Sequence, residues 1–174
     1  LPLPLKRSFE ERTGVKVIEG YGLTESSGVV ATNPLQGENR AGTIGQPLPQ
    51  TRVRLLDKDD PLRDPPPGEP GELAVAGPQV MQGYWNRPDA AATAFVERDG
   101  ERWLRTGDIA VIEPDGFLRI VDRLKDMINV GGFKVFPSVL EKHLLDHPAV
   151  KEALVIGVPD AYHGERPRAY VTLE

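Results

Sequence analysis

Apolar residues recur at helical spacing in two segments of the chain, one at its beginning and one in its last quarter. Gly14 ends the first segment, because glycine readily takes the left-handed backbone conformation that closes a helix. In the later segment Ser138 and Glu141 have the spacing of a capping box, in which two side chains satisfy amides of the first turn. The helices expected are 3–13, 137–147 and a short alanine-rich one at 88–95. The stripe that the second helix is expected to bury is Leu140, Leu144 and Leu145.

Elsewhere apolar residues alternate with polar ones or form short runs, which is typical of β-strands. Turn residues separate these runs: the run 65–68 (Pro-Pro-Pro-Gly) dominates residues 59–71, and residues 114–116 (Pro-Asp-Gly) have the composition of a hairpin turn. Residues 33–50 are rich in Asn, Pro and Gly and are expected to form a loop. The strands expected are 15–18, 52–57, 72–76, 103–105, 109–112, 117–121, 150–158 and 169–173.

The pattern changes at the charged segment 122–126, which lies between two apolar runs. We place a domain boundary there, between residues 1–123 and residues 124–174. The second part reads as strand, helix, strand, strand, and it ends on a strand without the closing elements that such a unit normally has. The sequence therefore predicts a β-rich α+β chain in two parts, and we expect it to be a fragment of a larger protein.

Composition excludes several classes of function. The 174 residues carry a net charge of −5, which is a poor electrostatic match for nucleic acid. The chain has no cysteine, so disulfides, cysteine zinc sites and cysteine nucleophiles are excluded. Neither a signal peptide nor an apolar run of the roughly 20 residues that span a bilayer is visible. We expect a cytoplasmic protein, and peripheral membrane contact stays open.

Residues 20–25 (Gly-Tyr-Gly-Leu-Thr-Glu) are the first with candidate chemistry. The glycines allow close approach of backbone to a ligand, Tyr21 offers a flat aromatic face, Thr24 a hydroxyl for phosphate and Glu25 an oxygen for Mg²⁺. The alternative is an ordinary turn with the tyrosine packed on the core. The segment is not a dinucleotide fingerprint, because the third glycine is missing.

Three other segments have both a functional and a structural interpretation. In residues 106–108 (Thr-Gly-Asp) the aspartate could accept bonds from two ribose hydroxyls or form an Asx turn. Residues 122–126, with the Gly-Gly turn and lysine of residues 130–134, could recognise an anion at a hinge or form a salt-bridged linker. His143 and His147 have metal-ligand spacing, but no glutamate lies between them as in a metalloprotease motif, and we interpret both as structural.

Five short segments stand in one order along the chain: 21–25 (YGLTE), 42–45 (GTIG), 83–88 (GYWNRP), 105–108 (RTGD) and 122–126 (DRLKD), followed by the longer segment 141–159. Together they resemble the adenylate-forming (AMP-binding) synthetase family, and within it the long-chain fatty-acid–CoA ligases. The resemblance covers essentially the whole chain. It implies the end of the large AMP-binding domain over 1–123, as a distorted β-barrel-like subdomain, and the first part of the small C-terminal domain over 124–174.

The resemblance implies a two-step acid–thiol ligase. A carboxylate attacks the α-phosphate of Mg·ATP to give acyl-AMP and pyrophosphate, and the CoA thiol then displaces AMP. It also assigns roles to residues. Gly20 and Gly22 belong to the nucleotide-binding segment, Tyr21 stacks on the adenine, Thr24 contacts the α-phosphate and Glu25 binds Mg²⁺. Asp108 and Arg123 contact the ribose, Ile120 packs near the base, Lys125 is the hinge, and Gly131, Gly132 and Lys134 lie in the pantetheine loop. The implied partners are fatty acid, ATP and CoA.

The chain departs from the family pattern at its two ends. The phosphate-binding Ser/Thr/Gly-rich loop is absent, as is the lysine that stabilises the adenylation transition state, so we expect the chain alone to have negligible ligase activity. Of the acyl tunnel, only residues 26–29 could be present. Two alternatives remain: another adenylate-forming enzyme, such as an aryl- or short-acyl-CoA ligase or an acyl-AMP ligase, and a non-catalytic AMP-binding module.

Overall fold

The structure of the chain, a computed structural model, describes residues 3–173 and divides into two compact units. The large unit comprises Leu1–Thr106 and Ala110–Ile120, and the small unit comprises Gly107–Ile109 and Val121–Glu174. The described residues form three α-helices and three β-sheets, none of which closes into a barrel. The β-rich α+β class is therefore confirmed, with open sheets in place of a closed barrel. The domain boundary after residue 123 stays a prediction.

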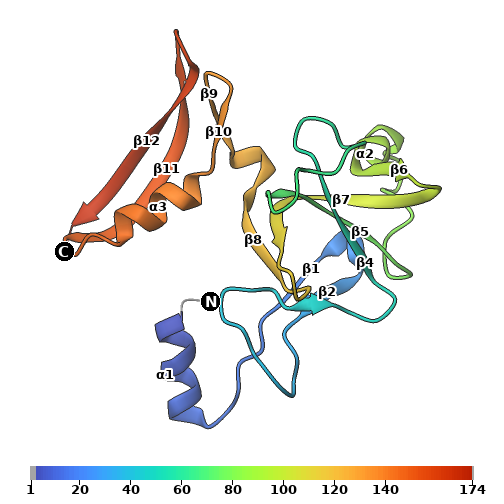
Figure 1. Ribbon diagram of the computed structural model, residues 1–174, viewed down its shortest axis with the longest axis horizontal. Coiled ribbons are helices and arrows are strands. Elements are labelled where there is room, and N and C mark those ends of the chain that lie inside the picture. Colours follow the sequence, from blue (N-terminus) through green and yellow to red (C-terminus); the bar gives the residue numbers. More distant parts are fainter. Residues whose placement is uncertain (1–2, 174) are drawn as a thin grey trace. The chain divides into compact units, whose positions relative to one another are not determined.

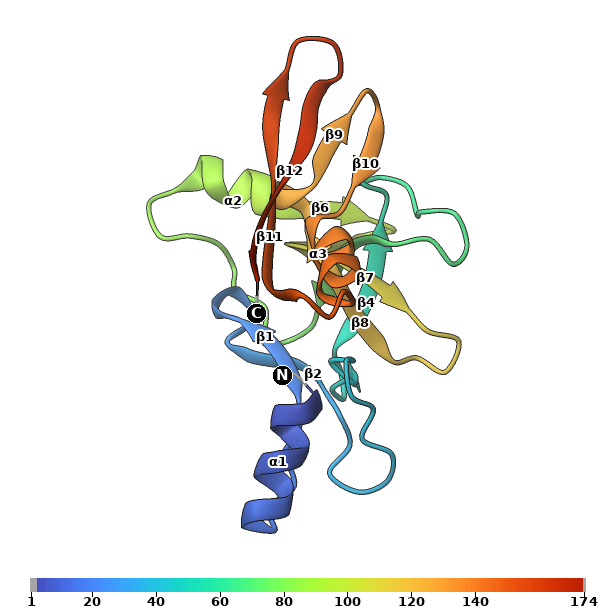
Figure 2. The same cartoon turned by 90° about the vertical axis from the view of Figure 1, so that its left-hand side faces the viewer.

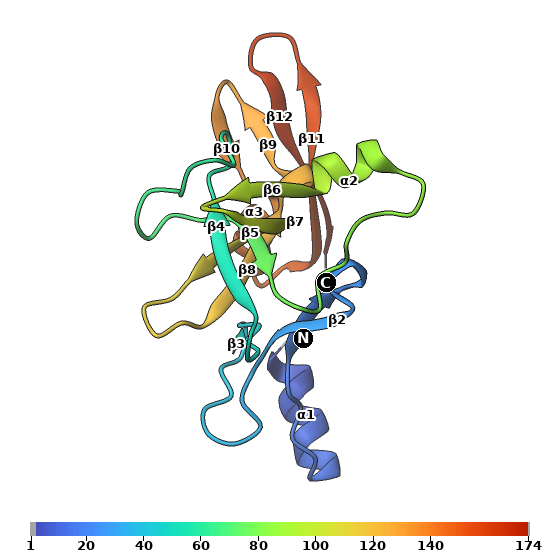
Figure 3. The ribbon, with the colours of Figure 1, turned by 90° about the vertical axis from the view of Figure 1, so that its right-hand side faces the viewer.

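One sheet of the large unit has the strand order β4-β5-β7-β6, and β8 pairs with β7 outside this path. Figure 3 shows these strands side by side, with helix α2 leading into β6. Every residue of the central strand β5 is buried. The elements are β4 (Arg52–Leu56), β5 (Gly71–Ala76), α2 (Pro88–Ala94), β6 (Phe95–Arg98), β7 (Glu101–Ile112) and β8 (Leu118–Arg123).

The other sheet of the large unit is small and antiparallel, in the order β1-β2-β3. Helix α1 precedes it in the chain, and Figure 2 shows the helix leading up to the β1–β2 hairpin. Gly14 closes the helix as expected, with a φ of 68° and its amide 2.9 Å from the Glu10 carbonyl. The elements are α1 (Leu3–Thr13), β1 (Gly20–Leu23), β2 (Gly28–Thr32) and β3 (Gln46–Pro47).

The core of the large unit lies on both faces of β5. Because successive side chains of a strand point to opposite faces, Leu73 and Val75 join one apolar cluster, while Ala74 and Ala76 join another. The first cluster also contains buried residues of the small sheet, so it holds the two sheets together. Its other buried members are Val30, Ala31, Ala110 and Leu118. The second cluster is completed by Leu56, Val96 and Trp103.

Two strand predictions in the large unit are wrong. Residues 15–18 form no strand, because side chains satisfy the backbone there: the Val17 amide donates to Glu10 Oε1 (2.8 Å), and its carbonyl accepts from Asn39 Nδ2 (3.0 Å). The segments 103–105 and 109–112 are one strand, β7, which continues through Gly107 at a φ of 72°. A left-handed glycine can act as an irregularity within a strand and need not end it.

The small unit contains one antiparallel sheet in the order β10-β9-β12-β11. Helix α3 packs against β11, and Figure 1 shows the helix running beside the long β11–β12 hairpin. The predicted outline of strand, helix, strand, strand lacks the first hairpin, β9–β10, which precedes the helix. The elements are β9 (Ile128–Val130), β10 (Phe133–Val135), α3 (Pro137–Leu145), β11 (Val150–Asp160) and β12 (Gly164–Leu173).

The predicted capping box of α3 is wrong. The Ser138 amide donates to Asp122 Oδ2 (3.0 Å), and its hydroxyl donates to the Val121 carbonyl (2.8 Å). Glu141 accepts from the Val155 amide of β11 (2.8 Å) instead of reaching back to the helix start. A carboxylate from outside the helix therefore satisfies the first turn. The expected apolar stripe is also narrower, because Leu145 is exposed.

Candidate functional site

The turn after β1 presents Thr24 and Glu25. These residues begin a short 3₁₀ helix (Thr24–Ser26) that ends at Ser27 in the left-handed conformation, with a φ of 53°. Ser26 is fully buried, and its hydroxyl contacts the Leu23 amide (3.2 Å) and the Gly28 carbonyl (2.8 Å). This buried serine fixes the turn from beneath, so that Thr24 is exposed and Glu25 half-buried.

Glycine at position 22 is required by the packing of the β1–β2 hairpin. A Cβ atom there would lie 2.1 Å from the Gly28 carbonyl oxygen, a distance that no side chain tolerates. At Gly20 the atom nearest to an added Cβ would be 3.2 Å away, so the steric requirement for glycine is weaker there. The β1–β2 register shifts between Tyr21 and Gly22, which marks the same close approach. Gly22 therefore has a structural reason that is independent of any ligand.

Tyr21 and Ile120 share one packing environment. Both are half-buried and pack against the apolar cluster that holds the two sheets of the large unit together. One side of the tyrosine is thus anchored on a rigid core, which is how a flat aromatic face is kept in one orientation. The resemblance places both residues near the adenine base, and both pack on this cluster.

The Glu25 side chain is held by a residue far away in the sequence. The Tyr84 hydroxyl donates to Glu25 Oε1 at 2.6 Å, and the Met81 amide donates to the Glu25 carbonyl at 2.8 Å. The hydrogen bond to the carboxylate raises the pKa of Tyr84 above its ordinary value of 10.0, because the bond favours the protonated phenol. Tyr84 therefore stays a neutral donor over the physiological range.

In the segment 105–108, two residues have structural contacts and a third, Asp108, is a candidate binding residue. Arg105 pairs with the buried Glu72 carboxylate (2.7 Å), and the Thr106 hydroxyl donates to the Leu73 carbonyl (2.7 Å), so both residues tie β7 to β5. Asp108 follows the left-handed Gly107 and belongs to the small unit. Its carboxylate is almost fully buried and lies 3.0 Å from Arg123 Nε, whose own side chain is 61% exposed. Asp108 and Arg123 are thus brought together.

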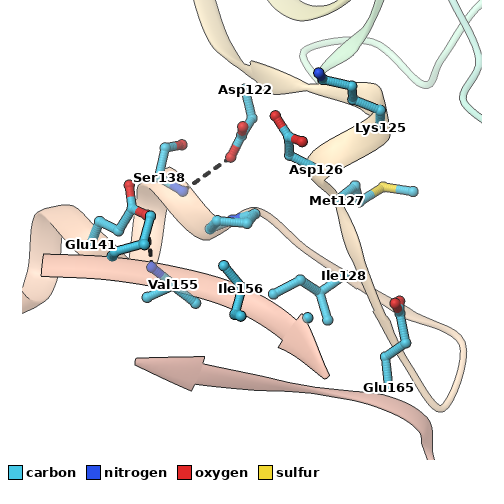
Figure 4. A pocket seen from close by; sticks show the side chains of 13 residues that line it. Asp122, Lys125, Asp126, Met127, Ile128, Ser138, Glu141, Val155, Ile156 and Glu165 are labelled. Carbon is cyan, nitrogen blue, oxygen red and sulfur yellow. Dashed lines mark hydrogen bonds between the residues drawn. The ribbon is translucent and has the colours of Figure 1, made fainter. Parts of the chain in front are cut away.

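Lys125 is exposed in a 3₁₀ turn (Leu124–Asp126) beside a cavity of about 470 Å³ in the small unit. Figure 4 shows the carboxylates that line it. Three of them already accept a backbone amide: Asp122 from Ser138, Glu141 from Val155 and Glu165 from Asn129. Each of these three carboxylates therefore has a structural partner in the backbone.

Gly131 and Gly132 form the tip of the β9–β10 hairpin, with φ values of 58° and 94°. The Gly131 amide donates to the His163 carbonyl (2.8 Å), so this tip adjoins the turn between β11 and β12. Lys134 follows in β10 and is half-buried. The three residues assigned to one loop are therefore neighbours in a single hairpin, and a left-handed backbone explains both glycines.

Two family models match the chain. The model of the AMP-binding enzyme matches residues 1–85, and that of the AMP-binding enzyme C-terminal domain matches residues 139–174. The chain belongs to the AMP-binding enzymes.

Curated relatives of this AMP-binding chain include CoA ligases of two kinds. It is 48% identical over 173 residues to the long-chain-fatty-acid–CoA ligase of Escherichia coli O6:H1, covering 97% of this chain and 30% of the relative. It is 43% identical over 173 residues to the feruloyl-CoA synthase of an Amycolatopsis species, covering 98% of this chain and 34% of the relative. The chain therefore spans about a third of the length of these relatives.

Solved structures of similar fold include ATP-bound MatB from Rhodopseudomonas palustris, with a TM-score of 0.84 and 35% identity over 98% of this chain and 33% of that one. Another is the o-succinylbenzoate CoA synthetase MenE of Bacillus subtilis in complex with ATP and magnesium ion, with a TM-score of 0.77 and 37% identity over 99% of this chain and 34% of that one.

One segment shared with the AMP-binding family, 42–45, has a structural explanation in this chain. Gly45 has a φ of 82°, and a Cβ there would lie 2.0 Å from the Thr32 carbonyl carbon. Thr43 is buried, and its carbonyl accepts from the fully buried Asn33 side chain (3.0 Å). The segment also pairs with Leu118 at the start of β8. It joins the two sheets of the large unit and carries no candidate ligand group.

The segment 83–88 contains Trp85, which its apolar character predicts to be a core residue; that prediction is wrong, because Trp85 is 89% exposed. No binding or catalytic role was predicted for any residue of the segment. The structure shows Tyr84 against Glu25, a contact between residues 59 positions apart. The sequence offered only a tyrosine that follows a glycine, and the folded chain shows which carboxylate this tyrosine contacts.

No helix among residues 3–173 has the length and apolarity that a membrane crossing needs.

Proposed function

We propose that this chain forms the nucleotide-binding and thiol-transfer part of an ATP-dependent long-chain fatty-acid–CoA ligase. The observation that carries the proposal is the 48% identity to such ligases over 97% of the chain. The complete protein would join a fatty acid to the α-phosphate of ATP with release of pyrophosphate. The CoA thiol would then attack the acyl carbon, with release of AMP.

The large unit supplies the proposed contacts to adenine and α-phosphate. Tyr21, braced on the apolar core, stacks on the base, and Ile120 packs near it on the same cluster. Gly20 and Gly22 let the backbone approach the ligand. Thr24 is exposed at the start of its turn, where its hydroxyl is available to donate to the α-phosphate.

Glu25 fits a magnesium ligand, because a half-buried carboxylate held by a neutral donor presents the hard oxygen that this ion prefers. Within residues 3–173 no three acidic or histidine side chains gather as a metal cage. Such a site suits an ion held by one carboxylate together with substrate phosphates. Bound there, magnesium would neutralise the charge that develops on the phosphates.

The small unit supplies the proposed ribose, hinge and CoA contacts. Asp108 accepts bonds from the ribose hydroxyls, and Arg123, whose Nε lies 3.0 Å from that carboxylate, also contacts the ribose. Lys125 is the proposed hinge, since an exposed residue in a short turn can change its backbone angles without loss of packing. Gly131 and Gly132 line the pantetheine, and Lys134 aids binding of CoA phosphate.

A second candidate is an aryl-CoA ligase, favoured by the 43% identity to feruloyl-CoA synthase. Of residues 26–29, the only ones proposed to line the acyl tunnel, Ser26 is fully buried beneath the turn and Val29 is 49% exposed. The two candidates differ in the acid that the complete protein would activate.

The test is ATP–pyrophosphate exchange by the full-length protein that contains this chain. Fatty acids of increasing length and ferulate would each be offered, and we expect the highest kcat/KM with a long-chain fatty acid. A higher value with ferulate would establish the second candidate. The 174-residue chain alone is expected to form no acyl-CoA, and measurable product from it would contradict the expectation that the phosphate-binding loop and the lysine are required.

A further inference from the structure

The hydrogen bond between Tyr84 and Glu25 is short and joins two separate turns. Its oxygen–oxygen distance of 2.6 Å lies in the range of charge-assisted bonds from a hydroxyl to a carboxylate. It engages Oε1 only, so Oε2 of the same carboxylate takes no part in it. Glu25 is half-buried and Tyr84 40% exposed, which places the pair at the surface of the large unit where a ligand can reach it.

The segment that carries Tyr84 is fixed on both sides of the phenol. Before it, the Met81 amide binds the Glu25 carbonyl (2.8 Å), and the Gln82 carbonyl accepts from Arg102 of β7 (2.8 Å). After it, a turn closes between the Tyr84 carbonyl and the Arg87 amide (3.2 Å), with Asn86 left-handed at a φ of 52°. The position of the hydroxyl is therefore set by backbone contacts as well as by its bond to Glu25.

We propose that Tyr84 is a positioning residue for nucleotide-bound magnesium: its hydroxyl holds Glu25 in one orientation, in which the carboxylate would bind the metal ion. The inference rests on the proposed function, in which Glu25 is the magnesium ligand. Groups that orient a metal-binding carboxylate change metal affinity when they are removed, although they do not touch the ion. A neutral phenol suits this role because it donates to the carboxylate and does not itself compete for the cation.

The test is Tyr84→Phe in the full-length protein that contains this chain. The substitution keeps the ring and deletes only the hydroxyl. We expect the Mg²⁺ concentration for half-maximal pyrophosphate exchange to rise about 10- to 100-fold, with much of the activity restored at saturating Mg²⁺. Binding of Mn²⁺ in the presence of ATP, followed by electron paramagnetic resonance, should weaken by the same factor. Tyr170→Phe, the same deletion on β12, is the matched control and should leave both constants unchanged.

The outcomes separate this inference from the proposed function. If Glu25→Gln weakens Mn·ATP binding and Tyr84→Phe does not, the positioning role is overturned and the role of Glu25 stands. If Glu25→Gln also leaves the binding unchanged, the proposed metal ligand itself fails. Should Tyr84→Phe fail to fold, the wild-type protein decides: Mn·ATP should broaden the NMR signal of the Tyr84 ring, and an unbroadened signal overturns the proposal.

Discussion

Each of the two units is stabilised internally in a different way. Most of the buried apolar side chains among residues 3–173 belong to the large unit, where β5 is covered on both faces. In the small unit the fully or nearly fully buried apolar residues are Ile109, Ile128 and Val155. The β11–β12 hairpin leaves large apolar residues exposed, among them Leu154 at 56% and Leu173 at 67%.

The small unit has few buried apolar side chains, and three carboxylates add hydrogen bonds between its elements. Asp122, Glu141 and Glu165 each accept a backbone amide from another element: the start of α3, β11 and β9, respectively. Apolar burial is non-directional, whereas these bonds fix the position of one backbone atom relative to another. The difference shows that acids around a cavity can have structural partners.

The largest expected effect is on the large unit. Leu73→Ala removes a fully buried side chain from the cluster that joins its two sheets. We expect the free energy of unfolding to fall by about 2–5 kcal/mol, the usual cost of such a truncation in a packed core. Denaturant unfolding followed by far-UV circular dichroism measures it. Leu154→Ala on the exposed hairpin face is the matched control, and an equal loss there would remove the distinction between the units.

A smaller effect is expected on the small unit. Asp122→Ala removes the carboxylate that caps the Ser138 amide, so the start of α3 loses a charge-assisted hydrogen bond. The expected loss is about 1 kcal/mol, as for the removal of an N-cap side chain. It should appear as faster hydrogen exchange of the first-turn amides of α3. Asp126→Ala, which removes an exposed acid from the same cavity, should leave that exchange unchanged.

Local patterns of the sequence were enough for elements whose residues interact mainly with their neighbours. The α1 helix and its Gly14 end, the Pro88 start of α2, and strands β4 and β5 follow from spacing and turn residues. The short strands β9 and β10 could not be found in this way, because three residues on each side of a Gly-Gly pair carry too little pattern. Their pairing is decided by contact with each other and with β12.

The candidate site, like the short strands, could be predicted only in part from local sequence patterns. Composition and order indicated Tyr21, Glu25 and Asp108, because aromatic, acidic and glycine residues stand out in a sequence. The partners of these residues come from distant segments: Tyr84 for Glu25 and Arg123 for Asp108. The capping box failed for a related reason, since Asp122 supplies from β8 what the local spacing assigned to Ser138 and Glu141. Spacing gives candidates, and only tertiary contacts decide which partner each one meets.

The smallest expected effect compares two aspartates whose pKa values are both lowered. In the large unit the pKa of Asp115 is lowered mainly by its hydrogen bond to the Arg40 guanidinium, 2.7 Å away. In the small unit the pKa of Asp160 is lowered mainly by the amides of His163 and Tyr162, with Arg166 farther away at 3.8 Å. One carboxylate is thus held by a cation and the other by backbone dipoles.

Because the folded pKa lies below the unfolded one at both sites, each group stabilises the fold at pH values above about 4 and loses this contribution as the pH falls through its folded pKa. Salt should separate them. At about 1 M NaCl the screening length is roughly 3 Å, so the pKa of Asp115 should rise towards its ordinary value. The pKa of Asp160 should move less, because the amides of His163 and Tyr162 remain in direct contact with its carboxylate.

NMR titration of the side-chain carboxyl carbons at low and high salt measures both pKa values, and Arg40→Gln should reproduce the effect of salt at Asp115 alone. Equal shifts with salt at the two sites would show that Arg166, rather than the amides, governs Asp160.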